Sequence, residues 1–156
     1  MTELDGFKIT YDQIEHNSPV VEMMVNEPKL KIIFLERNKI ESAISYWFAI
    51  KSQKWQADFD ELPTKDEEDY VNYSFVKNFC ETAHQDTNYY REVFAKHDIF
   101  NIQYDDLISD WAGVTSRLQE FLLVKNYNLP IVFSKRLKRP LTELVLNYSS
   151  LTKIHP

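Results

Sequence analysis

The sequence predicts a single α/β domain, spanning residues 1–156, with a largely parallel sheet. Apolar segments of strand length alternate along the chain with amphipathic segments of helical spacing, an order typical of βαβ units. The length fits one domain of ordinary size, and 44% apolar residues are enough for a packed core. No internal repeat or low-complexity segment divides the chain.

Two strands are predicted in the first quarter of the chain. Residues 7–11 alternate apolar and polar side chains, which favours a short strand. A polar, helix-leaning stretch then extends to about residue 26, with an interruption at 17–19. Residues 30–36, Leu-Lys-Ile-Ile-Phe-Leu-Glu, form the clearest strand, and we expect it to be buried on both faces because it is almost continuously apolar.

A helix is predicted over residues 39–53. Asn38 has the side chain of an N-cap and Glu41 follows three residues later, a variant of the capping box. Apolar residues then recur at helical spacing. The segment 58–69 that follows holds seven acidic residues around a Leu-Pro pair, and we expect an exposed loop there.

The second half of the chain predicts a further strand between helices. Apolar spacing over residues 69–97 indicates one long helix or two shorter ones, and residues 99–104 form a second good strand. Residues 105–123 predict an amphipathic helix, which Gly113 weakens by about 1 kcal/mol relative to alanine. Three strands make a thin sheet with exposed edges, so we expect another segment or a second chain to complete it.

Composition excludes several classes of protein. A net charge of -6 disfavours a general nucleic-acid binder. A Walker-type or dinucleotide-binding loop needs several neighbouring glycines, but the chain has only Gly6 and Gly113, so a self-contained loop of this kind is excluded. The longest purely apolar runs, with tyrosine not counted, are four residues, which argues against a membrane span or a secretory signal. The single cysteine, Cys80, excludes an internal disulfide and predicts a cytoplasmic location.

The sequence predicts no metal site. Asp105 and Asp106 are interpreted as the N-cap and a first-turn acid of the helix that follows. His84 and His97 lack ligand spacing, and His16 is interpreted as a surface residue.

The strongest candidate site is the junction between the strand 30–36 and the helix 39–53. Arg37 leaves the carboxyl end of the strand, where open α/β sheets place their ligands, and the helix N-terminus adds its amide groups and dipole. Ser45 lies eight residues later on the same helix and could donate a hydrogen bond to a bound phosphate. In the alternative interpretation, Arg37 pairs with an acidic neighbour and Ser45 is a small packing residue.

Residues 31–55, KIIFLERNKIESAISYWFAIKSQKW, resemble the 3′-phosphate-binding element of sulfotransferases that use 3′-phosphoadenosine 5′-phosphosulfate (PAPS). In that family an apolar strand ends in Arg and a Ser follows eight residues later, as do Arg37 and Ser45 here. The continuation at 49–55 is closest to the bacterial trehalose-sulfotransferase type. Three further segments, 6–13, 102–107 and 139–148, resemble other family segments in the same order.

The resemblance implies a P-loop-like three-layer sandwich that lacks its first βα unit, the unit that holds the 5′-phosphosulfate in the family. It implies PAPS as co-substrate and a hydroxyl-bearing small molecule or carbohydrate as acceptor, with no metal, nucleic acid or membrane. A second chain or a homo-oligomer would complete the sheet. The alternative is a non-catalytic descendant that binds a nucleotide or a protein partner.

The resemblance also suggests further site residues. Lys8 would place a positive charge near the transferring group, with a surface lysine as the alternative. A basic cluster near the C-terminus would close over the 3′-phosphate, unless it is a solvated turn; its members are Lys135, Arg136, Lys138 and Arg139. A catalytic base is not evident, because Thr10 and Tyr11 are poor bases at neutral pH.

Overall fold

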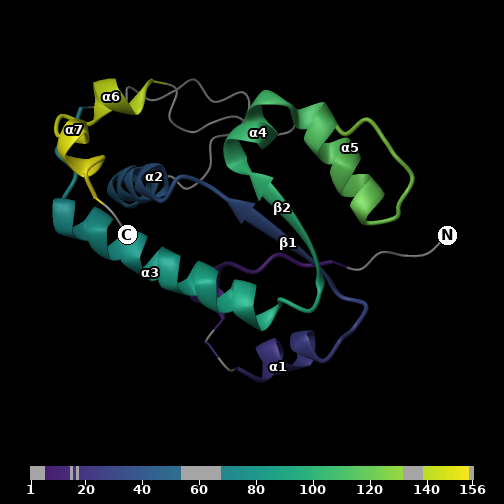
Figure 1. The fold of residues 1–156 in the computed structure, drawn as a ribbon. Helices are drawn as coiled ribbons and strands as arrows, with labels where there is room; N and C mark the ends of the chain where they lie inside the picture. The colour runs from purple at the N-terminus through teal and green to yellow at the C-terminus, as the bar shows by residue number, and fades with distance from the viewer. Residues whose placement is uncertain (1–5, 15, 17, 54–67, 132–138, 155–156) are drawn as a thin grey trace.

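In the described part of the chain, two parallel strands lie among helices (Figure 1). The computed structural model describes residues 6–14, 16, 18–53, 68–131 and 139–154. In chain order the elements are η1 (Tyr11–Gln13), α1 (Pro19–Val25), β1 (Lys31–Glu36), α2 (Lys39–Ser52), α3 (Tyr73–Val93), β2 (Asp98–Gln103), α4 (Tyr104–Ser109), α5 (Trp111–Phe121), α6 (Leu141–Leu144) and α7 (Tyr148–Leu151). The predicted α/β class is confirmed.

Strands β1 and β2 pair in parallel and end level with each other. The register runs from Lys31 opposite Asp98 to Glu36 opposite Gln103. The connection between them contains both α2 and α3, as a crossover between parallel strands requires. The residues that follow Glu36 and Gln103 therefore lie at the same edge of the sheet.

Helices contact both faces of the sheet. Arg91 of α3 lies over the ring of Phe34, with 5.0 Å between the guanidinium carbon and the ring centroid. Phe121 of α5 packs against Phe100 with ring centroids 5.3 Å apart. The partner of Phe100 across the sheet is Ile33, next to Phe34, and successive strand residues point to opposite faces, so α3 and α5 cover opposite faces.

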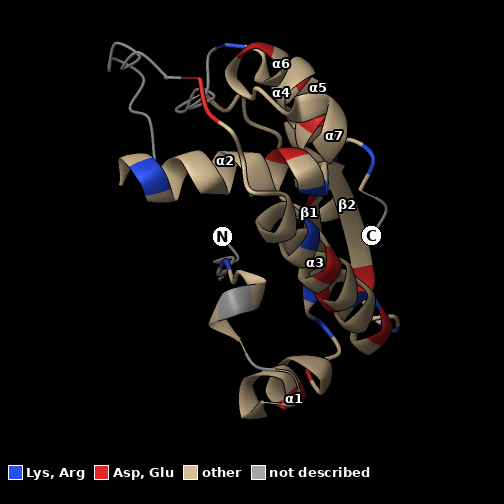
Figure 2. Cartoon of the chain, turned by 90° about the vertical axis from the view of Figure 1, so that its left-hand side faces the viewer, with Lys and Arg blue, Asp and Glu red and all other residues tan. Residues whose placement is uncertain are grey.

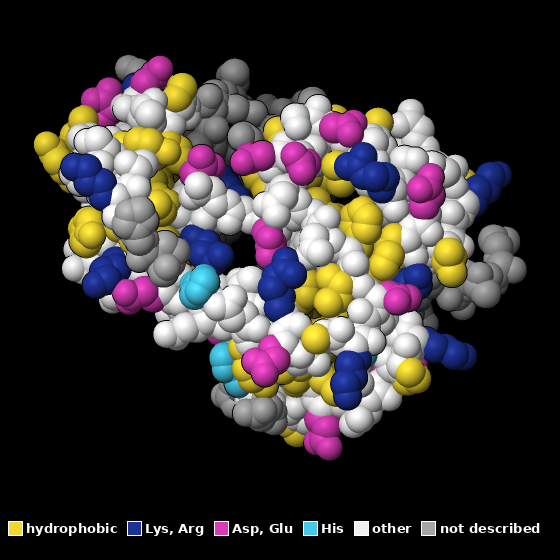
Figure 3. Space-filling model, viewed as in Figure 1, with side chains coloured by type: hydrophobic (Ala, Val, Ile, Leu, Met, Phe, Trp, Pro, Cys, Tyr) yellow, Lys and Arg dark blue, Asp and Glu magenta, His cyan; other side chains and the backbone are white. Residues whose placement is uncertain are grey.

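The expectation that β1 is buried on both faces is wrong. Ile32 and Phe34 are buried, whereas Ile33 and Leu35 on the other face are 41% and 55% exposed. Among the described residues β1 pairs only with β2. In that part of the chain no strand lies along its other edge, so the helix that would accompany such a strand is not there to cover these two side chains. Exposed apolar side chains interrupt the polar surface in the space-filling view as well (Figure 3).

The predicted strand at residues 7–11 is absent from the structure. Residues 7–10 are irregular, and Tyr11 begins the short 3-10 helix η1. The Thr10 amide donates to Gln13 Oε1 at 3.0 Å, and the Gln13 amide donates to the Thr10 carbonyl oxygen at 2.9 Å. These local bonds occupy the backbone groups that a strand would use. The ring of Tyr11 stacks on Tyr90 of α3 at 5.2 Å, which anchors this conformation.

The predicted helix at 105–123 is two helices that meet at Asp110. The Asp110 side chain accepts a hydrogen bond from the Gly113 amide at 3.0 Å and so caps α5. A Cβ at position 113 would approach the Asp110 carboxylate closely, so a larger residue there would require this side chain to shift. The N-cap of α4 is Gln103, and Asp105 and Asp106 both lie in its first turn, so Asp105 is not the N-cap.

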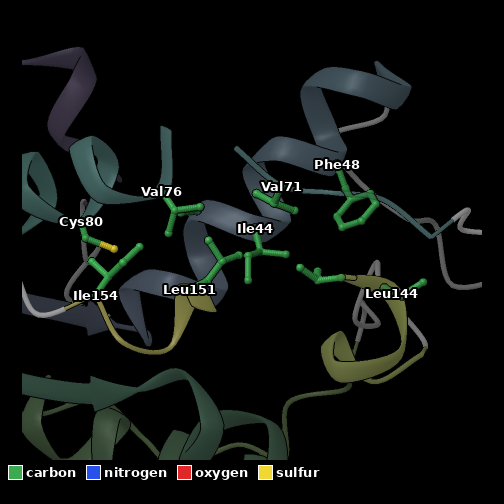
Figure 4. Close-up of a cluster of buried hydrophobic side chains, with 10 residues drawn as sticks. Ile44, Phe48, Val71, Val76, Cys80, Leu144, Leu151 and Ile154 are labelled. Carbon is green, nitrogen blue, oxygen red and sulfur yellow. The ribbon is translucent and has the colours of Figure 1, made fainter. Parts of the chain in front are cut away.

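The helices at 39–53 and 69–97 are confirmed, the second as the single helix α3, and their packing forms the larger apolar core (Figure 4). Ile44 of α2, Val76 and Cys80 of α3, and Leu151 of α7 are all fully buried in it. The Asn147 side chain fastens the C-terminal part to this core by accepting from the Val71 amide at 3.1 Å and donating to its carbonyl at 2.9 Å.

A second apolar cluster lies at the amino end of the sheet. Its buried members come from α1, β1 and α3: Val21, Ile32, Phe34, Tyr90 and Phe94. The predicted acidic loop at 58–69 lies largely outside the described residues. None of the helices in the described ranges is long and apolar enough to cross a lipid bilayer.

Candidate functional site

Arg37 lies at the carboxyl end of the sheet, between β1 and α2. Glu36 and Gln103 are the paired last residues of the two strands. Arg37 and Tyr104, which follow them, therefore lie at the same edge of the sheet. The guanidinium carbon of Arg37 is 4.5 Å from the centroid of the Tyr104 ring. Two segments that the sequence analysis singled out separately, one around Arg37 and one beginning near Tyr104, therefore meet in space.

The Arg37 guanidinium has unused hydrogen-bonding capacity. Of the carboxylates in the described ranges, the closest is Glu41, whose Oε2 lies 4.0 Å from a terminal nitrogen, beyond hydrogen-bond distance. Its Nε is buried without a hydrogen-bond partner in the described part of the chain. The predicted alternative, an acidic neighbour that pairs with Arg37, is thus realised only as a loose ion pair. A guanidinium with free donors at a helix start suits an anion with several oxygens.

Helix α2 directs its N-terminus toward this edge of the sheet. The Asn38 side chain accepts from the Glu41 amide at 3.1 Å, so the predicted N-cap is confirmed. The amide groups and dipole at the start of α2 add positive potential beside Arg37. Ser45 is half-buried on the same helix, and its hydroxyl makes no hydrogen bond to any described residue.

Glu36, the last residue of β1, is held by two other elements. Its Oε1 accepts from Arg91 of α3, at 2.6 Å from Nη2 and 3.2 Å from Nε. Its Oε2 accepts from the side-chain Nε2 of Gln103 at 2.9 Å, and Arg91 Nη2 also donates to Asn101 Oδ1 at 2.7 Å. Hydrogen bonding by Arg91 lowers the pKa of Glu36. This network was not predicted, although a carboxylate that ends an apolar strand is a signal for it in the sequence.

The structure describes two of the other predicted site residues, Lys8 and Arg139, and neither makes a polar contact with Arg37. Lys8 is exposed in the irregular segment before η1 and makes no polar contact with a described residue. Arg139 contacts two carboxylates, Glu68 at 3.3 Å and Glu143 at 3.6 Å. The remaining members of the basic cluster lie outside the described residues: Lys135, Arg136 and Lys138.

His16 is more constrained than an ordinary surface histidine. Its Nε2 lies 3.0 Å from Asp86 Oδ1, and its ring stacks on Tyr89 with centroids 3.9 Å apart. Tyr11, which lies near it in the sequence, has a raised pKa because burial disfavours the phenolate. Within the described ranges no group of three potential metal ligands is found.

The sequence model of the sulfotransferase domain family matches residues 15–148, most of the chain, and includes Arg37, Ser45, Arg91 and Tyr104. The chain belongs to the sulfotransferase family. This confirms the family resemblance seen in the sequence. No curated protein and no solved structure matches the chain significantly.

Proposed function

We propose that this sulfotransferase-family protein binds the 3′-phosphate of PAPS at Arg37 and Ser45 and takes part in sulfuryl transfer to a hydroxyl acceptor. The observation that supports this most directly is the Arg37 guanidinium, whose buried Nε lacks a partner in the described part of the chain. The family generally uses PAPS, and the spacing of Arg37 and Ser45 matches the resemblance described above.

The geometry suggests that different groups would make different contacts with the phosphate. Arg37 would supply the charge, and the stack on Tyr104 would keep its plane fixed. The α2 amides and the free Ser45 hydroxyl would donate further hydrogen bonds to phosphate oxygens. Glu41 would be displaced from its loose pairing, because a dianionic phosphate attracts the guanidinium more strongly than one carboxylate at 4.0 Å.

Sulfuryl transfer breaks the S–O bond to the 5′-phosphate of PAPS, forms an S–O bond to the acceptor and transfers the acceptor's proton to a base. Tyr11 is disfavoured as that base by its raised pKa. With only two, widely separated glycines, the 156 residues contain no glycine-rich phosphate loop. We therefore propose that the 5′-phosphosulfate is held by a segment outside these residues or by a second chain, within a larger P-loop-like three-layer sandwich.

The finer assignments remain predictions. These are the resemblance to the trehalose-sulfotransferase type, the small-molecule or carbohydrate acceptor, and the cytoplasmic location. A role for Lys8 in transfer also remains a prediction, as does closure of the basic cluster over the phosphate. The lack of a glycine-rich phosphate loop and of an evident catalytic base favours the second candidate function, a non-catalytic protein that binds adenosine 3′,5′-bisphosphate without turnover.

Calorimetric titration with adenosine 3′,5′-bisphosphate tests the proposed site. The natural protein should bind it more tightly than adenosine 5′-phosphate, which lacks the 3′-phosphate. Arg37→Ala should lower the affinity about tenfold or more, because it removes a charge-assisted contact. Arg117→Ala is the matched control, since it removes an exposed arginine paired with Asp110 on α5. Equal affinities for the two nucleotides would contradict the 3′-phosphate site.

Turnover separates the two candidate functions. Transfer of radiolabelled sulfate from PAPS to a panel of alcohols and sugars would support the enzyme. Bisphosphate binding without transfer, even after addition of proteins encoded next to this one, would support the non-catalytic alternative.

A further inference from the structure

Glu36 and Arg37, adjacent residues at the end of β1, differ in how many hydrogen bonds their side chains make. Glu36 accepts three hydrogen bonds, two from Arg91 and one from Gln103. Among the described residues, Arg37 contacts the face of the Tyr104 ring and forms the loose pair with Glu41. One side chain is therefore immobilised beside another that has unused donors.

The bonds to Glu36 join three elements at one point. Arg91 belongs to the last turn of α3 and is itself held over the Phe34 ring and by Asn101. Gln103 ends β2. A carboxylate with both oxygens bonded in this way cannot rotate freely, so the backbone at the end of β1 is fixed relative to α3 and β2.

The Asn38 cap fixes the other side of Arg37. Its hydrogen bond to the Glu41 amide sets where α2 begins. Arg37 thus sits between two restrained residues, and few backbone torsions remain to change the direction of its side chain. The stack on Tyr104 then completes its orientation.

We propose that Glu36, held by Arg91 and Gln103, is a positioning residue that orients the Arg37 guanidinium for an anion. The inference rests on the proposed function for its ligand, the 3′-phosphate. It assigns a second, indirect role at that site to an acidic residue and to an arginine of α3.

Simple electrostatics makes the opposite prediction for Glu36. Removing a carboxylate near an anion site removes repulsion and should strengthen binding. Glu41 follows this rule, because it competes directly for Arg37. If Glu36 orients the guanidinium, its removal should instead weaken binding. Removal of Glu36 and removal of Glu41 should then change the affinity in opposite directions.

Titration of matched variants with adenosine 3′,5′-bisphosphate tests this difference. Glu36→Ala and Arg91→Gln should each lower the affinity about threefold to tenfold, as expected for the partial loss of a charged contact. Glu41→Ala should leave the affinity unchanged or raise it. Glu36→Gln should recover affinity relative to Glu36→Ala, because its amide oxygen still accepts from Arg91.

The orientation of Arg37 can also be measured without any ligand. In the ¹⁵N–¹H spectrum, the Arg37 Nε–Hε signal, assigned by its loss in Arg37→Lys, should be displaced by the Tyr104 ring and exchange slowly. Glu36→Ala should move it toward the position of an exposed arginine, and Glu41→Ala should not. Gln103→Ala removes one hydrogen bond to Glu36 and keeps the pair with Arg91, so it should move the signal by a smaller amount. It replaces Glu36→Ala as the test if that variant does not fold.

Ser18→Ala controls for loss of stability. It removes the N-cap of α1, far from Arg37 in the chain, and should change neither the affinity nor the signal. If the natural protein does not bind the nucleotide but the Arg37 signal still depends on Glu36, the proposed function fails and the positioning role stands. An unchanged signal with unchanged or tighter binding in Glu36→Ala would overturn the positioning role and leave the proposed function intact.

Discussion

The two strands end level with each other, yet the junctions that follow them differ. After β1, Arg37 and the Asn38 cap lead into the 14-residue helix α2, which has four buried residues. After β2, the six-residue helix α4 begins at once, without a side-chain cap and without a buried residue. The first junction is restrained by packing, cap and hydrogen bonds, whereas the second contributes the Tyr104 ring.

The comparison shows that the two strand-to-helix junctions of this small parallel sheet contribute differently to the candidate site. Charged residues of both signs lie close to the strands and along α3 (Figure 2), so net charge alone does not mark the site. Arg37 stands out because its neighbours are restrained while its buried Nε has no hydrogen-bond partner among the described residues. Four experiments test this difference between the two junctions, and they are ordered by the size of the expected change.

Truncation of a buried residue in α2 should be far more costly than the same change in α4. Ile44 is 0% exposed in the larger core, whereas Ile108 is 47% exposed. Ile44→Ala should lower the free energy of unfolding by about 2–5 kcal/mol, and Ile108→Ala by less than about 1 kcal/mol. Urea denaturation measures both. Similar losses would mean that α4 is as well packed as α2.

Removal of the Asn38 cap should affect both stability and binding. Asn38→Ala and Asn72→Ala each remove a side chain that caps a long helix, and each should cost about 1 kcal/mol of unfolding free energy. Because only Asn38 adjoins Arg37, only Asn38→Ala should also weaken adenosine 3′,5′-bisphosphate binding. Thermal denaturation and calorimetry on the same samples compare the two. Equal affinities in the two variants would show that the cap does not contribute to the site.

The second junction should contribute to nucleotide binding through the aromatic ring of Tyr104. Tyr104→Phe keeps the aromatic face under Arg37 and should bind the bisphosphate almost normally. Tyr104→Leu should lower the affinity about threefold, because a stack of this kind contributes about 0.5–1 kcal/mol at an exposed site. The opposite order of affinities would indicate that the phenol hydroxyl, and not the ring face, matters.

The smallest effect is a pH dependence that arises from Glu36. Arg91 lowers the pKa of this carboxyl in the folded protein, so its contribution is present above the unfolded-state carboxyl pKa. That contribution is lost as the pH falls through the lowered pKa. In Glu36→Gln the free energy of unfolding should therefore decline less steeply on acidification than in the natural protein. Parallel pH profiles would show that the Glu36–Arg91 pair adds little net stability.

Much of the architecture could be predicted from local patterns. The strand at 30–36, the Asn38 cap and the helices over 39–53 and 69–97 were predicted because apolar periodicity and capping act over a few residues. The strand at 7–11 was predicted wrongly, because the contact between Tyr11 and Tyr90 joins residues far apart in the chain. The break at Asp110 was missed because Gly113 could be interpreted only as a helix defect.

The sequence by itself determined which side chains leave the carboxyl end of β1, because the order of residues along a strand and its helix is a local property. Only the tertiary structure decided what surrounds them. The parallel register brings Tyr104 to Arg37, and the crossover through α3 brings Arg91 to Glu36. Contacts between residues 55 or more positions apart depend on how the elements pack, which no local pattern encodes.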